Sequence, residues 1–148
     1  MKQLSENSTR IFCALIDSLH GGCFTEIINE PFMSLHIEEL DVKQQTPYGI
    51  GNQYSLCHYY EQEGDLMQDP EMCFLMIDDR KSDVSNMGKV TVIPYMFQQA
   101  NLSIYQQSII WLSNGTANID AKIQADHAAF AETWLTNIEA QGYFNIES

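Results

Sequence analysis

The acidic residues are the side chains whose type and spacing say most about chemistry. They fall into three groups, which are Glu38, Glu39 and Asp41, then Glu61, Glu63, Asp65, Asp69 and Glu71, and last Asp78, Asp79 and Asp83. Three interpretations remain open for them. They form a solvated rim that keeps the protein soluble, a carboxylate array that imitates a phosphate backbone in a basic groove, or a paired-carboxylate catalytic or magnesium site. The middle group is the largest, and we predict that it carries partner binding.

Histidine and cysteine are the other residue types that could do chemistry. His36, His58 and His127 are candidates for catalysis or metal binding, but no H-x-x-x-H, H-E-x-x-H or C-x-x-C spacing supports a metal site. Cys57 and Cys73 lie symmetrically about Asp65, so they could be cross-strand neighbours. A disulfide there needs an oxidising setting, and buried structural thiols are the simpler expectation. We therefore predict no metal, no cofactor and no catalytic residue.

Other nucleophile and nucleotide signatures are missing from the sequence. There is no G-x-S-x-G, no S-x-x-K, no Walker A run and no G-x-G-x-x-G. The formal net charge is -13, from 20 acidic and 7 basic residues. Because nucleic-acid affinity depends on Lys and Arg displacing counterions, this balance disfavours direct binding of DNA or RNA. A basic protein surface is the partner that such a chain suits.

The elements that must position these residues begin with a hairpin. Residues 54–60 and 72–77 each alternate with period two, and acidic, glycine and proline residues connect them. Further strands are expected over 32–40, 89–97 and 104–112, with an edge or bulge at Pro94 and a loop over 41–53. Segment 23–28 is ambiguous.

Helices are expected at the two ends of the chain. Residues 5–20 carry an apolar stripe, with Ser5 or Ser8 as N-cap and Gly21-Gly22 as the stop. Residues 119–141 form the longer helix, whose stripe includes Ile123, Phe130 and Trp134. The fold prediction is a single α+β domain over 1–148. It has a mostly antiparallel meander of about five strands, with both helices packed on one face.

Three segments of the chain resemble a known group of sequences. The run HYYEQEGDLMQDPEM, with the later YQQSIIWL and FAETWLTNIEAQGY, resembles a family of short uncharacterised bacterial proteins found on plasmids and other mobile elements. The resemblance covers roughly residues 32–143. It implies a mobile-element context and assigns no catalytic residue.

These observations lead to a functional hypothesis with two alternatives. We predict a non-catalytic acidic protein-binding module, in its sharper form a nucleic-acid mimic that inhibits a host defence nuclease such as a CRISPR or restriction enzyme. The alternatives are a small enzyme using His, Cys or carboxylate residues, and a homodimeric accessory protein. No signal segment or membrane span is visible in the sequence, so the expected location is the cytoplasm.

Overall fold

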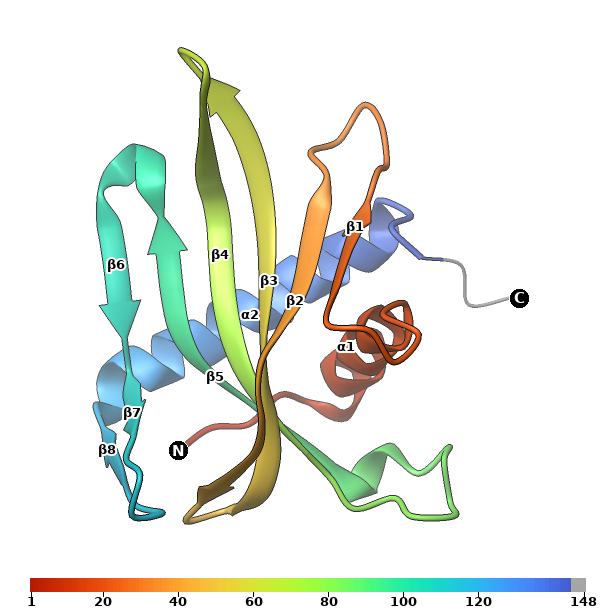
Figure 1. Ribbon diagram of the computed structural model, residues 1–148, viewed down its shortest axis with the longest axis vertical. Helices are drawn as coiled ribbons and strands as arrows, with labels where there is room; N and C mark the ends of the chain where they lie inside the picture. Colours follow the sequence, from red (N-terminus) through yellow and green to blue (C-terminus); the bar gives the residue numbers. More distant parts are fainter. Residues whose placement is uncertain (145–148) are drawn as a thin grey trace.

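The computed structural model describes residues 1–144 and has an α+β architecture. Helices α1 (Glu6–Asp17) and α2 (Ala121–Ala140) lie behind a six-stranded antiparallel sheet in the view of Figure 1. The sheet has the order β1–β2–β3–β4–β5–β6, and a two-stranded sheet joins β7 to β8. The strands are β1 (Phe24–Ile27), β2 (Leu35–Thr46), β3 (Gly49–Gln62), β4 (Asp65–Asp78), β5 (Val90–Gln99), β6 (Ile104–Gln107), β7 (Ile109–Trp111) and β8 (Ala117–Ile119). Single 3-10 turns, η1 (Met87–Lys89) and η2 (Ala100–Leu102), flank β5.

Both helices begin where a side chain satisfies a free backbone N–H. Ser5 Oγ accepts from Ser8 N at 3.2 Å, and Asp120 Oδ1 accepts from Ile123 N at 3.1 Å. Gly142 follows α2 with φ of 86°, a conformation that glycine adopts without a Cβ clash. The two predicted helices and the greater length of the second are confirmed. Within residues 1–144, neither helix is long and apolar enough to cross a membrane.

The strands are longer and more numerous than their periodicity predicted. The expected loop over 41–53 is wrong, because β2 continues to Thr46 and turns through Pro47 and Tyr48 directly into β3. Register shifts between Glu39 and Gln44 interrupt the alternation of β2, so its second half does not look like a strand in sequence. The sheet has six strands instead of about five because the ambiguous segment 23–28 forms β1 at its edge.

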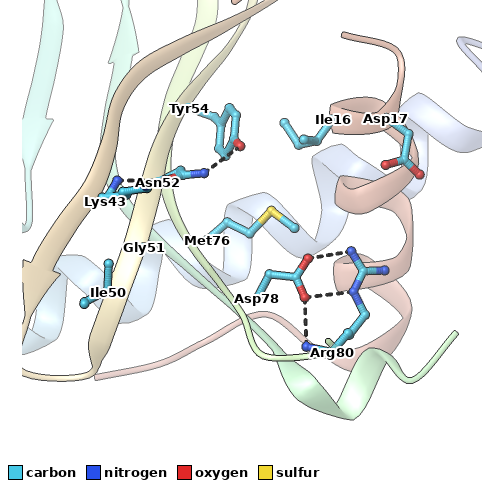
Figure 2. Close-up of a pocket in the computed structure, with 10 residues that line it drawn as sticks. All are labelled: Ile16, Asp17, Lys43, Ile50, Gly51, Asn52, Tyr54, Met76, Asp78 and Arg80. Carbon is cyan, nitrogen blue, oxygen red and sulfur yellow. Dashed lines mark hydrogen bonds and ion pairs between the residues drawn. The ribbon is translucent and has the colours of Figure 1, made fainter. Parts of the chain in front are cut away.

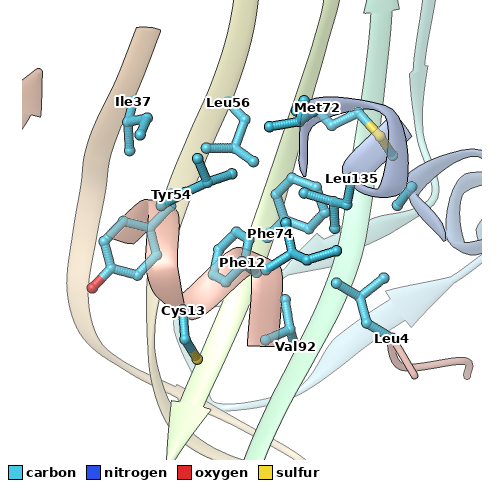
Figure 3. Close-up of a cluster of buried hydrophobic side chains, with 14 of the residues drawn as sticks. Leu4, Phe12, Cys13, Ile37, Tyr54, Leu56, Met72, Phe74, Val92 and Leu135 are labelled. Carbon is cyan, nitrogen blue, oxygen red and sulfur yellow. The ribbon is translucent and has the colours of Figure 1, made fainter. Parts of the chain in front are cut away.

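The main hydrophobic core lies between the helices and one face of the sheet (Figure 3). Phe12 from α1 packs on Phe74 of β4, with ring centroids 4.9 Å apart, and Leu135 from α2 is fully buried in the same cluster. The expected stripe of α2 is only partly right. Trp134 is buried, whereas Phe130 is 39% exposed. Small residues such as Ala131 take the central line of the helix, and Phe130 lies at its flank against Phe97.

A second, smaller core lies on the other face of the sheet. Leu75, Ile93 and Ile109 are fully buried there. The segment expected as one strand over 104–112 is split at Ser108, and its second half pairs with β8. Pro94 adjoins a register shift between β4 and β5, as its missing N–H predicted.

Candidate partner-binding ribbon

The hairpin of β3 and β4 extends past the rest of the sheet. Glu63 and Gly64 form its two-residue turn, with φ of 52° and 87°, the positive values that a tight hairpin turn requires. The strands pair from Gln62 opposite Asp65 to Tyr59 opposite Gln68. The last pairs with the neighbouring strands occur at His58 on β3 and at Glu71 on β4. Residues 59–68, called the ribbon below, therefore project as two strands without neighbours (Figure 1).

The structure separates the five predicted binding residues into two sets. Glu61, Glu63 and Asp65 are exposed on the ribbon. Asp69 and Glu71 are half-buried at its base, where Asp69 accepts from Gln99 Nε2 at 2.9 Å and Glu71 accepts from Ser55 Oγ at 2.6 Å. The acidic segment is thus mostly strand, and not the long connection expected from its composition.

The carboxylates of the ribbon are not neutralised by neighbouring cations. In the described part of the chain the ion pairs are Arg10–Glu139, His36–Glu26 and Arg80–Asp78, at 2.8, 2.9 and 2.8 Å. None of them involves the ribbon. Leu66, paired with Glu61, is 67% exposed, so an apolar side chain stands among the charges. The ribbon combines unpaired charge with accessible backbone edges and apolar area.

Cys57 and Cys73 are placed where their thiols are poor nucleophiles. Cys57 is opposite Glu71, and Cys73 is opposite Ser55, so the two cysteines are diagonal neighbours on paired strands and not directly opposite each other. The turn at residues 63–64 and the bulge before Tyr59 set this register, and all four cysteines are free. Burial, and next the charge of Glu71, raises the pKa of both Cys57 and Cys73 to about 12. Because the thiolate is the reactive form, this environment disfavours cysteine chemistry.

The predicted histidines are held within the protein by hydrogen bonds and ring contacts. His36 Nε2 lies 2.9 Å from Glu26 Oε2 on the face opposite the helices. His58 Nδ1 donates to Ser34 O at 3.2 Å, and its ring contacts Trp134 and Tyr143, with centroids 5.5 and 5.3 Å away. Burial lowers the pKa of His58, so its neutral form is favoured.

His127 belongs to a hydrogen-bonded chain that the sequence did not reveal. Its Nδ1 lies 2.8 Å from Ser108 Oγ, and its Nε2 lies 3.2 Å from Gln106 Oε1. Ser108 Oγ also lies 3.2 Å from Tyr95 O. This resembles a nucleophile and its base, but Ser108 is only 1% exposed, so a substrate has no access to it. These hydrogen bonds instead hold α2 against the junction of β6 and β7.

A polar pocket of about 310 Å³ lies between α1 and the ends of β2, β3 and β4 (Figure 2). Two of its charged groups, Asp78 and Arg80, satisfy each other. Arg80 Nε and Nη2 donate to Asp78 at 2.9 and 2.8 Å, and Arg80 Nη1 donates to Val84 O. The guanidinium is therefore committed within the protein and not free for an anion. Among residues 1–144, no three His, Cys, Asp or Glu side chains are grouped so that they could hold a metal ion.

Comparison with known families places the chain. A family model, the domain of unknown function DUF6908, matches residues 7–144, from the first turn of α1 to just beyond α2. The chain belongs to the DUF6908 family. The match includes the ribbon and both cores, so the fold described above is that of a DUF6908 domain. No curated protein and no solved structure matches the chain.

Proposed function

We propose that this DUF6908 domain is a non-catalytic acidic protein-binding module that docks its ribbon on a basic surface of a partner protein. The observation that carries the proposal is the projection of Glu61, Glu63 and Asp65 beyond the sheet, without an ion pair in the described chain. Unpaired exposed charges raise the rate of association with a partner of opposite charge. The formal net charge of -13 acts in the same direction.

In its sharper form, the partner is a nucleic-acid-binding enzyme of host defence, such as a CRISPR effector or a restriction enzyme. The resemblance to bacterial mobile-element proteins supplies this context, and the acidic ribbon supplies a means of occupying a groove that normally receives phosphates. A ribbon is narrow, and strand neighbours stand about 4.7–4.9 Å apart, so it can enter a groove that a globular surface cannot. Cytoplasmic location belongs to the same proposal.

Affinity capture of proteins from a bacterial lysate, with three forms of the chain as baits, tests this proposal. The baits are the wild-type chain, a ribbon variant (Glu61→Gln, Glu63→Gln, Asp65→Asn) and a control variant. In the control, Glu30→Gln, Asp79→Asn and Asp126→Asn remove the same charge from other exposed positions. None of these six side chains accepts a side-chain hydrogen bond or forms an ion pair in the described structure, so both variants should fold.

We expect the wild-type and control baits, but not the ribbon variant, to capture one or more proteins from a bacterial lysate. Added DNA or RNA should displace these proteins from the baits. Equal capture by the ribbon variant and the control variant would show that the ribbon has no specific part. If nucleic acid does not displace the captured protein, the domain is a protein-binding module, but the nucleic-acid mimic is refuted.

One observation favours the homodimer as a second candidate. Strand β1 is an outer strand of the sheet, and Phe24 on it is 55% exposed, while Ile28 and Phe32 further along the chain are 71% and 44% exposed. An exposed edge with apolar neighbours can pair with a second copy. Sedimentation equilibrium tests this candidate: a dimer that Phe24→Glu dissociates would support it, and a monomer at high concentration would remove it.

A further inference from the structure

A second pocket, of about 370 Å³, opens on the sheet face opposite the helices. Its aromatic residues come from three successive strands, Tyr95 on β5, Tyr105 on β6 and Trp111 on β7. Asp41 and Gln53 line it from β2 and β3, and Met96 adds a thioether. It shares no residue with the ribbon.

The curvature of the sheet forms the pocket. The β2–β3 turn comes round to the β7–β8 hairpin, where Tyr48 and Trp111 are in edge contact with centroids 6.3 Å apart at 87°. A Cβ added at Gly115 would lie 3.5 Å from the side chain of Gln45 in the same region, so the two hairpins approach closely. The second core, with Leu75, Ile93 and Ile109 fully buried, supports the pocket from below. Such a concave site at the mouth of a curled sheet is a common place for ligands.

Two of the aromatic rings of the pocket pack against each other. Tyr95 and Trp111 have centroids 5.6 Å apart and planes at 81°, so they meet almost at a right angle. Tyr105 is 61% exposed at the rim, where its ring is accessible. The Tyr95 hydroxyl donates to Gln53 Oε1 at 2.6 Å, and this bond fixes the ring. Aromatic faces carry negative potential, so an accessible ring face can attract a cation.

The charged residue that lines the pocket is acidic. Asp41 is exposed, accepts a hydrogen bond from Val42 N at 2.9 Å, and forms no ion pair in the described chain. No Lys or Arg is among the described residues that line the pocket. Burial above all, with Cys73, Tyr105 and Asp41 adding to it, raises the pKa of Tyr95, so its hydroxyl stays protonated and keeps its hydrogen bond to Gln53. An anionic ligand would be repelled here.

We propose that this pocket binds an alkylammonium group, with the rings of Tyr105 and Trp111 beside the cation, Asp41 as its counter-charge and the buried Tyr95 as support for Trp111. The group comes from a free quaternary amine such as choline or from a lysine side chain of a protein. Both present the same chemistry, a cation carried on an apolar stem. The inference is independent of the ribbon, because the two sites share no residue.

The test uses the tryptophan of the pocket as its reporter. The chain has two tryptophans, so Trp134→Phe leaves Trp111 as the only one. The probes are choline, its uncharged isostere 3,3-dimethylbutan-1-ol, and short peptides with lysine or trimethyl-lysine. Isothermal titration calorimetry of the wild-type chain measures the same affinities without the Trp134→Phe substitution.

We expect choline or a lysine peptide to change Trp111 fluorescence in a saturable way, and the uncharged isostere to bind about tenfold more weakly. Asp41→Asn and Tyr105→Ala should each weaken binding about 5- to 30-fold, the range expected for roughly 1–2 kcal/mol. Both positions are exposed, so the fold should tolerate the changes. The matched control Asp79→Asn should bind as the wild type does.

The relative affinities of choline and the peptides identify the source of the group. Tighter binding of choline points to a small molecule, and tighter binding of a peptide points to a protein. Equal binding of choline and its isostere, or no saturable binding of any probe, would overturn the proposal. So would an unchanged affinity in both Asp41→Asn and Tyr105→Ala.

Discussion

Truncation of two aromatic residues on α2 distinguishes the buried face of the helix from its flank. Trp134 is 6% exposed, and its Nε1 makes no hydrogen bond in the described structure, so Trp134→Ala removes packing alone. Its ring contacts His58 and Phe130, with centroids 5.5 and 6.2 Å away. A cavity of this size in a closed core should cost about 3–5 kcal/mol. At 2–4 °C per kcal/mol, the melting temperature should fall by about 6–20 °C.

Phe130→Ala should cost much less, although both residues lie on the stripe predicted from the sequence. Phe130 is 39% exposed, so its removal opens a surface notch and no closed cavity. Only the transfer term for the buried part of the ring is lost, about 1–2 kcal/mol. Urea unfolding of both variants, followed by circular dichroism, measures the difference. Equal costs, or a larger cost for Phe130→Ala, would refute the placement of α2.

Other predictions concern pH, thiol reactivity and the turn. Burial lowers the pKa of His127 below 6.5, so the unfolded chain binds its proton first on acidification. Stability should therefore be full above pH 6.5 and fall as the pH drops from 6.5 towards the lowered pKa. His127→Gln should flatten this dependence in urea titrations, and an unchanged slope would exclude His127 as its cause. Iodoacetamide should modify the exposed Cys23 of the native protein, while Cys57 and Cys73, each with a pKa raised to about 12, should react only in denaturant. Peptide mass mapping checks this, and rapid labelling of all three would show that the sheet opens. Glu63 has φ of 52°, so Glu63→Asn should stabilise the hairpin by up to about 1 kcal/mol, since Asn adopts left-handed φ more readily. A lower urea midpoint for this variant would contradict the turn geometry.

The sequence predicted the fold best where local chemistry decides local structure. Ser5 caps the start of α1 and Gly142 follows the end of α2, and each acts within a single turn of its helix. The helix ends could therefore be predicted closely. The second half of β2 could not be predicted, because its strand conformation depends on pairing with β3 across two register shifts. The change of sheet at Ser108 depends likewise on contacts with Tyr95 and His127, which are distant in sequence.

The candidate site was predictable in composition but not in shape. The acidic character of residues 61–71 is evident from the sequence, and the structure places Glu61, Glu63 and Asp65 on the ribbon. Asp69 and Glu71 could not be separated from them, because their partners, Gln99 and Ser55, come from other parts of the sheet. The aromatic pocket was hidden for a similar reason. Only the curl of the sheet brings Trp111 and Asp41, which are distant in sequence, into one pocket.

The central claim is that the ribbon steers this domain to a basic partner, and the association rate tests it most directly. The captured partner is mixed with the wild-type chain, the ribbon variant and the control variant at low and at high salt. We expect the ribbon variant to associate about tenfold more slowly than the control at low salt, and the difference to shrink as salt screens the charges. Equal rates for the ribbon and control variants at low salt, without a dependence on salt, would contradict the account.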